Sequence, residues 1–159
     1  MTITEKDKDL MREAIRLSEE SVMNGGGPFG AVIAKDGKVV AGASNSVTLQ
    51  NDPTAHAEVA CIREACRQLG TFDLSGCTIY TSCEPCPMCL GAIYWARPKA
   101  LYFAADRKRA AASNFDDEFI YKEVPLPTDK RSLKTACIQV PGSNLPFDEW
   151  DAKTDKTEY

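Results

Sequence analysis

Three cysteines within seven residues constrain this 159-residue chain more than any other feature of its sequence. They stand in the segment Ser-Cys-Glu-Pro-Cys-Pro-Met-Cys, which occupies residues 82–89. The chain has seven cysteines in all, an odd number, and such a dense cluster in a reducing compartment indicates metal binding or catalysis rather than a framework of disulfides. The cluster predicts that the fold holds these thiols together at one site.

The candidate metal ligands stand at the N-termini of two predicted helices. A helix that begins near Pro87 makes Cys86 its cap and Cys89 its third residue, so both sulfurs lie at the positive end of the helix, where thiolates are favoured. The only histidine of the chain, His56, heads a second predicted helix that ends near Gly70. If the two N-termini face each other, one nitrogen and two sulfurs form three corners of a tetrahedral zinc site, and water takes the fourth.

Glu58 stands two residues after His56, close enough to reach a water at the open position without binding the metal. A carboxylate in that place suits a proton shuttle. The order His-x-Glu followed by Pro-Cys-x-x-Cys is the signature of zinc nucleobase deaminases. This chain carries it as His56-Ala57-Glu58 and Pro85-Cys86-Pro87-Met88-Cys89.

A structural zinc site is the alternative that these residues leave open. Cys83 forms a second Cys-x-x-Cys with Cys86, so a closed and inert site would use Cys83, Cys86, Cys89 and His56. Only the Pro-Cys-x-x-Cys register argues against Cys83 as a ligand. The other four cysteines fall on apolar elements and are expected to be small core residues: Cys61, Cys66, Cys77 and Cys137.

Hydrophobic periodicity predicts an α/β chain. Helices are expected at about 6–23, 57–69, 87–96 and 107–113, and strands at 30–34, 38–43, 77–82, 99–105 and 133–140. Asp36-Gly37 between the first two strands is a hairpin signal. This order implies a mixed sheet with helices on both faces, a three-layer α/β/α sandwich, with parallel connections after residue 77.

The charge and hydropathy of the sequence argue against two classes of binding partner, nucleic acid and membranes. The net charge is −4 and the pI is about 5.1, a poor electrostatic match for nucleic acid. The sequence has no apolar run of membrane-spanning length, and its first residues are charged where a signal peptide is apolar. We therefore expect a single cytoplasmic domain over residues 1–159 that binds neither nucleic acid nor membrane.

The sequence resembles the cytidine deaminase superfamily and, within it, the small bacterial guanine deaminases, through nearly the whole chain. The likeness is carried by GGPFGAVI, NDPTAHAE, YTSCEPCPMCLGAIYWARPKA, FDD and FIYKE. It implies a five-stranded sheet between helices, one zinc ion per subunit on His56, Cys86 and Cys89, Glu58 as proton shuttle, and hydrolysis of guanine to xanthine and ammonia. It also implies a homodimer in which residues 141–159 are exchanged between subunits in some members.

The resemblance further implies a purine pocket. Asn45 matches an asparagine that hydrogen-bonds the base, and Phe29 matches an aromatic that packs on the purine face. Asp117 matches the acid that serves the departing amino group, with the neighbouring Asp116 as the alternative. Two further aromatics match residues that close the pocket, the first of them from the neighbouring subunit: Trp95 and Tyr159.

Other aminated rings share the same zinc chemistry. Guanosine or a triazine stays open as substrate, because the size of a pocket cannot be read from one sequence. A deaminase of tRNA adenosine would use the same ligands but is expected to have a basic face and a route for an extruded nucleotide. The acidic charge balance and the Phe-Asp-Asp segment at residues 115–117 argue against that substrate.

Overall fold

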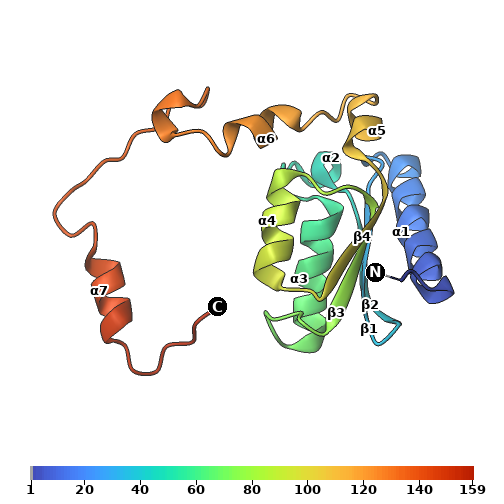
Figure 1. Ribbon diagram of the computed structural model, residues 1–159, viewed down its shortest axis with the longest axis horizontal. Coiled ribbons are helices and arrows are strands. Elements are labelled where there is room, and N and C mark those ends of the chain that lie inside the picture. Colours follow the sequence, from blue (N-terminus) through green and yellow to red (C-terminus); the bar gives the residue numbers. More distant parts are fainter. Residues whose placement is uncertain (1) are drawn as a thin grey trace. The chain divides into compact units, whose positions relative to one another are not determined.

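A four-stranded mixed sheet forms the centre of residues 2–119 in the computed structural model, which describes residues 2–159 (Figure 1). Its strand order is β2-β1-β3-β4. Strand β1 (Gly30–Lys35) pairs antiparallel with β2 (Lys38–Ser44) and with β3 (Cys77–Cys83), and β3 pairs parallel with β4 (Ala100–Ala105). The parallel pair confirms the connection predicted after residue 77.

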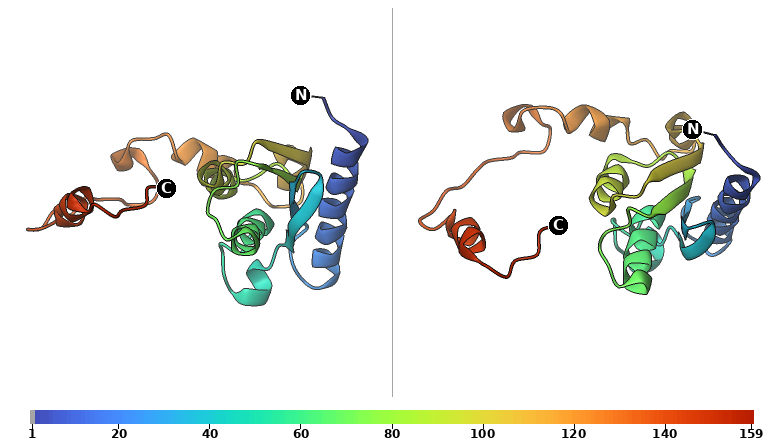
Figure 2. Two further views of the ribbon diagram at one scale, coloured as in Figure 1. Left: turned by 90° about the horizontal axis from the view of Figure 1, so that it is seen from below. Right: turned by 60° about the horizontal axis from the view of Figure 1, so that its bottom comes forward.

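Helices cover both faces of this sheet (Figures 1 and 2). Helix α1 (Glu5–Met23) packs on one face, and α3 (Ala57–Leu69) and α4 (Pro87–Ala96) lie on the other. Successive strand residues point to opposite faces, so Val32 joins the buried cluster under α1 and Ile33 joins the cluster under α3 and α4. The molecule therefore has the α/β/α layers that the sequence predicts.

Local backbone signals account for the hairpin between β1 and β2. Asp36 and Gly37 both have positive φ angles, 51° and 72°. Turns with two left-handed central residues match the twist of the strands they join, and Asp-Gly is a favoured pair for them. Four short helices complete the element list: α2 (Val47–Gln50), α5 (Arg107–Ala111), α6 (Glu118–Glu123) and α7 (Leu145–Ala152), with a 3-10 turn at Thr128–Lys130.

The prediction of a fifth strand is wrong for this chain. Residues 133–140 form no strand, and their side chains are exposed, Ile138 and Val140 included. A strand needs a neighbouring backbone to complete its hydrogen bonds, and within residues 2–159 none pairs with the outer edge of β4. Cys137 is exposed for the same reason, so its expected place in a core is also wrong.

Residues 120–159 form a second unit with little core of its own. Its local structure includes a turn in which Glu123 accepts hydrogen bonds from the backbone and hydroxyl of Ser132, at 2.8 and 2.9 Å. Several large apolar side chains of this unit are exposed: Val124, Leu133, Ile138, Val140, Leu145, Phe147 and Tyr159. None of the helices in residues 2–159 is long and apolar enough to cross a membrane.

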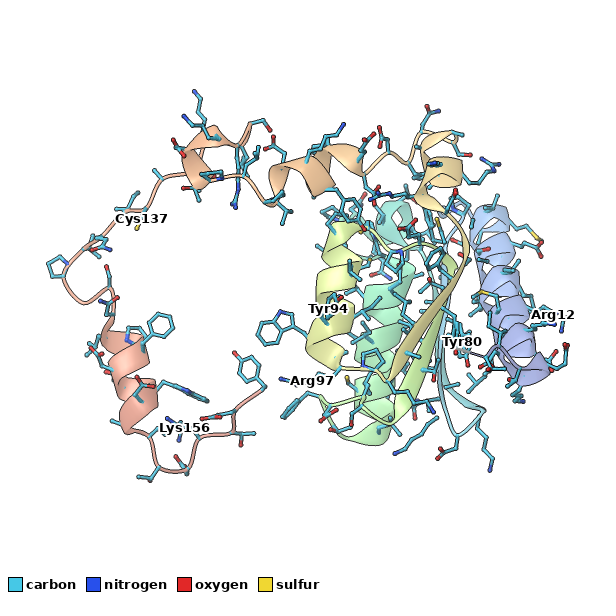
Figure 3. The ribbon with its side chains drawn as sticks, viewed as in Figure 1. Arg12, Tyr80, Tyr94, Arg97, Cys137 and Lys156 are labelled. Atoms are coloured by element: carbon cyan, nitrogen blue, oxygen red, sulfur yellow. The ribbon has the colours of Figure 1, made fainter. Side chains whose placement is uncertain are left out.

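Asp7 ties the first turn of α1 to the sheet. The Thr4 side chain and Asp7 form a capping box, in which the Asp7 carboxylate accepts the Thr4 N–H at 2.8 Å. The other carboxylate oxygen accepts the hydroxyl of Tyr80, on β3 beneath α1, at 2.6 Å (Figure 3). The hydrogen bonds from Thr4 and Tyr80 lower the pKa of Asp7 to about 2.

We expect Asp7→Asn to lower the melting temperature at pH 7, because a neutral amide is a weaker acceptor for both partners. Folding lowers the pKa of Asp7 from 3.8 to about 2, so its contribution to stability is present above about pH 4 and is lost as the pH falls through 2. Thermal unfolding followed by circular dichroism should show the difference from the wild type shrinking over that range. Asp9→Asn removes only an exposed ion pair with Arg12 and is the control; equal effects of both variants would contradict the assignment.

Candidate active site

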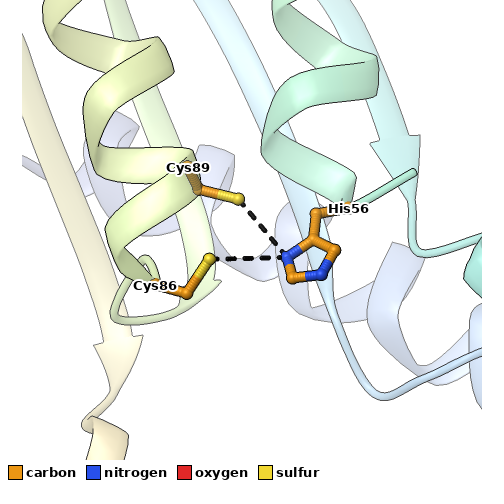
Figure 4. Close-up of side chains that lie close together, drawn as sticks. All are labelled: His56, Cys86 and Cys89. Carbon is orange, nitrogen blue, oxygen red and sulfur yellow. Dashed lines mark hydrogen bonds between the residues drawn. The ribbon is translucent and has the colours of Figure 1, made fainter. Parts of the chain in front are cut away.

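The N-termini of α3 and α4 face each other and carry three potential metal ligands (Figure 4). His56 is the N-cap of α3, Cys86 is the N-cap of α4, and Cys89 is the third residue of α4. In the described part of the chain, neither cap side chain bonds to the backbone of its own helix. The ring and the thiols turn toward one another instead, which confirms the predicted meeting of the two helix ends.

The distances between these side chains match the edges of a zinc tetrahedron. The His56 Nδ1 atom lies 3.6 Å from the Cys86 Sγ and 3.4 Å from the Cys89 Sγ. With Zn–S bonds of about 2.3 Å and Zn–N bonds of about 2.0 to 2.1 Å, tetrahedral geometry puts nitrogen and sulfur about 3.5 to 3.6 Å apart. All three ligand atoms lie within 4.8 Å of one another. The cluster is therefore already shaped to hold a zinc ion.

The electrostatics of the cluster favour a thiolate. Hydrogen bonds from Cys89 and from the His56 ring lower the pKa of Cys86 to about 4. The interaction with Cys86 also raises the pKa of His56, while the bond to the Cys86 thiolate raises the pKa of Cys89. Two thiols so close together cannot both ionise without a cation between them. A divalent metal supplies that cation, and binding it releases the remaining proton.

Cys83 is not part of this cluster. Its Sγ lies 3.8 Å from the carbonyl oxygen of Asp106, to which the thiol donates, and burial raises its pKa to about 11. Within residues 2–159, the cluster of possible ligands comprises only His56, Cys86 and Cys89. These side chains therefore do not form a closed site with a fourth protein ligand. A tetrahedral zinc ion on three protein ligands would keep one coordination position for a water or a substrate.

Glu58 lies beside the ligands without joining them. Its side chain is 6% exposed, and its Oε2 accepts a hydrogen bond from the Cys89 thiol at 3.4 Å. Burial raises the pKa of Glu58 above the usual value for a glutamate. A buried carboxyl with a raised pKa, beside the three candidate metal ligands, is suited to accept a proton and pass it on.

Asn45 and Phe29 lie next to each other, where β2 ends and β1 begins. The buried side-chain oxygen of Asn45 accepts the N–H groups of Gly27 and Val47, both at 3.3 Å. The Asn45 backbone N–H donates to the Phe29 carbonyl oxygen at 2.9 Å. These bonds fix the amide and the ring to the same piece of backbone, at the positions where the sequence predicts substrate contacts.

The two neighbouring aspartates differ in their surroundings. Asp116 is exposed, and its carboxylate accepts the backbone N–H of Glu118 at 2.9 Å, so it closes a turn at the start of α6. Asp117 is half-buried, and desolvation together with the Cys86 thiolate raises its pKa. The structure thus directs Asp116 to a local backbone role and brings the charge of Asp117 within range of the metal ligands.

Residues 4–105 match the family model of the cytidine and deoxycytidylate deaminase zinc-binding region, which contains this whole metal cluster. The chain belongs to the cytidine and deoxycytidylate deaminase family. Guanine deaminase of Bacillus subtilis (strain 168) is 52% identical over 150 residues, which cover 94% of this chain and 96% of that protein. A tRNA-specific adenosine deaminase of Aquifex aeolicus (strain VF5) is 42% identical over 99 residues, 62% of this chain and 66% of that protein.

A solved structure extends the likeness of this deaminase to the whole chain. The X-ray structure of guanine deaminase from Bacillus subtilis matches with a TM-score of 0.93 and 51% identity, over 96% of this chain and 98% of that one. The match reaches far beyond residue 105, where the family's zinc-binding region ends. The similarity to this relative therefore extends over nearly the whole length of both chains.

The pocket roles that the sequence predicts for two aromatics, Trp95 and Tyr159, are not tested by the exposure of their side chains. Trp95 is 65% exposed near the C-terminus of α4, and the rise of a helix puts it about 13 Å along the axis from Cys86. Tyr159 belongs to residues 120–159 and is 73% exposed. Their roles in closing the pocket stay predictions, that of Trp95 as a residue of the neighbouring subunit.

The sequence did not reveal two residues that contact the segments carrying the candidate site residues, Asp52 and Phe115. The Asp52 carboxylate accepts the backbone N–H and the hydroxyl of Thr54, at 2.8 and 2.7 Å, in the turn that leads to His56. Asp-x-Thr is a recognisable signal for such a turn. Phe115 packs edge-on against Phe29, with ring centroids 5.0 Å apart. That contact spans 86 residues of sequence, and no local pattern signals it.

Proposed function

We propose that this deaminase hydrolyses guanine to xanthine and ammonia, with one zinc ion per chain. The observation that carries the proposal is the set of His56 Nδ1 to cysteine distances, 3.6 and 3.4 Å, with the buried Glu58 beside them. Guanine is favoured as the substrate because the relative that matches nearly the whole chain is named guanine deaminase. The relatives named tRNA adenosine deaminase match a smaller share of the chain.

His56, Cys86 and Cys89 would hold the zinc ion, which would supply a Lewis acid able to lower the pKa of a water toward neutrality. Glu58 takes a proton from the water that attacks C2 of guanine and delivers it to the adjacent ring nitrogen. Asp117 then assists the departure of the amino group from C2. One water is consumed, the C2–N bond breaks, and xanthine and ammonia are released.

Asn45 and Phe29 bind the base in this proposal. The Asn45 oxygen is engaged by two backbone N–H groups, which directs the NH₂ group to serve as the donor toward a ring acceptor of the purine. Phe29 offers its ring to the purine face. Asp116, which caps a turn, contributes to the pocket by holding the backbone next to Asp117.

We expect Asn45→Asp to raise the KM for guanine about tenfold or more and to change kcat less. The carboxylate keeps the acceptor oxygen that holds Gly27 and Val47, but it loses the NH₂ donor and adds a charge. Steady-state kinetics of ammonia release measure both constants. Asn51→Asp, in the exposed turn after α2, is the matched control, and an unchanged KM for Asn45→Asp would remove Asn45 from the pocket.

The experiment that tests the proposed function is ammonia release from guanine, guanosine, adenosine, cytidine and a triazine, measured side by side with zinc-loaded protein. Rapid turnover of guanine alone supports the proposal. Turnover of guanosine or of a triazine alone would keep the zinc chemistry and reject the substrate. A tRNA anticodon stem-loop is assayed in parallel, and activity on it alone would replace the proposal with deamination of tRNA adenosine, a substrate that the net charge of −4 does not favour.

A homodimer that exchanges residues 141–159 is part of the same proposal. Residues 120–159 expose many large apolar side chains, and β4 has an unpaired outer edge in the described chain. Tyr94 exposes its ring on α4 (Figure 3), and the neighbouring Trp95 is exposed as well. A second copy that covers these surfaces would bring its Trp95 or Tyr159 to the pocket. Light scattering after size-exclusion chromatography should give twice the mass of one chain, and a monomer would contradict the exchange.

The cytoplasm is the compartment that we propose for this activity. All seven cysteines in residues 2–159 are free. An oxidising compartment favours disulfides between neighbouring thiols, and the pairing of Cys86 with Cys89 would remove two of the three metal ligands. A reducing environment keeps the site able to bind zinc.

A further inference from the structure

We propose that Phe115 is a positioning residue that holds Phe29 and the Asp117 segment in a fixed relation on the substrate side of the metal cluster. The inference rests on the proposed function and adds to it a residue that touches no ligand or reacting atom. Its basis is the contact between the Phe29 and Phe115 rings, whose centroids are 5.0 Å apart with planes at 88°. An edge-to-face arrangement at this distance is a favourable geometry for two aromatic rings.

Phe29, the first of the two rings, is one of the residues to which the proposed function assigns the binding of the base. The Phe29 N–H donates to the Gly27 carbonyl oxygen at 2.8 Å, and the Gly27 N–H donates to the Asn45 side chain at 3.3 Å. Phe29 also packs against the buried cluster beneath α3 and α4. Backbone hydrogen bonds and packing against the core therefore both restrict the position of Phe29.

The other ring belongs to the segment that carries the acid. Phe115 stands two residues before Asp117, and its N–H donates to the Ala110 carbonyl oxygen at 3.1 Å. The residue before it, Asn114, has a φ of 67°, and Asp116 closes the following turn on Glu118. The backbone from residue 114 to residue 118 is thus a compact turn, and the Phe115 ring is the part of it that reaches Phe29.

The Phe115 ring meets Phe29 outside the buried clusters. A cavity of about 480 Å³, lined by residues of α1, β4 and α5, lies beside both rings. Phe115 is 44% exposed and belongs to neither of the two buried clusters that residues 2–159 form. The contact with Phe29 is thus an apolar restraint on the turn that comes from outside the turn itself. Because Phe115 lies outside the core, its loss should displace the turn without unfolding the domain.

Kinetics of Phe115→Ala test the proposal, with zinc content and melting temperature measured in parallel. We expect kcat/KM for guanine to fall about tenfold to a hundredfold, since small displacements of catalytic groups have effects of this size. Phe115→Leu, which keeps apolar contact with Phe29, should recover part of the loss. Phe72→Ala is the matched control, because its ring is 51% exposed and follows the C-terminus of α3, far from His56.

A double-mutant cycle separates positioning from a general structural effect. In an Asp117→Asn background, Phe115→Ala should lower kcat/KM less than about threefold, because the group it positions is already lost. Independent, multiplicative losses would overturn the proposal, and so would a fall in zinc content that accounts for the lost activity.

Amide hydrogen exchange provides a readout that does not depend on the substrate. Residues 114–118 should exchange faster in Phe115→Ala than in the wild type, and Phe72→Ala should leave them unchanged. If the wild type fails to deaminate guanine, the proposed function is rejected, while unchanged exchange in Phe115→Ala rejects the positioning role. The two failures are therefore distinguishable.

Discussion

Replacing Glu58 with glutamine is expected to lower kcat for guanine about a thousandfold while zinc stays bound. The amide has nearly the same shape as the carboxylate but cannot carry a proton from the attacking water to the ring. Glu58 is not one of the three ligands, and its Oε2 contacts the Cys89 thiol at 3.4 Å. Ammonia release and zinc content, measured on the same preparation, check both halves of this expectation.

Glu64→Gln is the matched control for that experiment. Glu64 lies on the same helix, α3, and its carboxylate pairs with Arg67 on the surface, at 2.6 Å. The control makes the same chemical change without approaching the metal, so its turnover should stay within about twofold of the wild type. Near-normal turnover in Glu58→Gln would show that another group carries the proton, and loss of zinc would show that Glu58 acts as a ligand.

The metal centre was predictable from the sequence because its geometry is local. A Pro at the first position of a helix fixes Cys86 as the cap, and helical spacing then places Cys89 on the same end. His56 is fixed by the start of α3 in the same way. Only the meeting of two helix N-termini had to be inferred, and the layered α/β/α arrangement brings it about.

The edge of the sheet was not predictable in the same way. Residues 133–140 have the apolar alternation of a strand, but a strand exists only where a neighbouring backbone completes its hydrogen bonds. Sequence periodicity indicates which side chains are apolar on one face, but it does not identify the backbone that would pair with the segment. Ile138 is exposed, and no strand within residues 2–159 pairs with the outer edge of β4, so the periodicity of residues 133–140 alone could not predict whether they form a strand.

The residues proposed for the pocket were only partly predictable from the sequence. Asn45 and Phe29 follow from resemblance, and our proposal of Asp117 rather than Asp116 as the acid draws on the turn in which Asp116 bonds to Glu118. The Phe29–Phe115 contact joins the beginning of β1 to a turn after α5, so only the folded chain reveals it. Residues that support a site through long-range packing leave no periodic or motif signal in a single sequence.

Cys86→Ala is expected to weaken zinc binding at least about a hundredfold and to abolish turnover, since even the loss of groups outside the ligand set costs ten- to a hundredfold in metal affinity. With Cys86 removed, only His56 and Cys89 of the cluster remain to hold the ion. Zinc retained after dialysis against a competing chelator, quantified by mass spectrometry, measures the change. Cys137→Ala is the control, because Cys137 is exposed and outside the cluster.

Cys83→Ala extends the same measurement to the rival zinc site. A closed structural site would use Cys83 as its fourth ligand, so this variant would lose zinc as Cys86→Ala does. In the structure the Cys83 thiol donates to the Asp106 carbonyl oxygen instead, at 3.8 Å. We therefore expect Cys83→Ala to keep its zinc and most of its activity. Zinc loss in this variant would mean that no open position exists for water, and the hydrolytic mechanism would have to be abandoned.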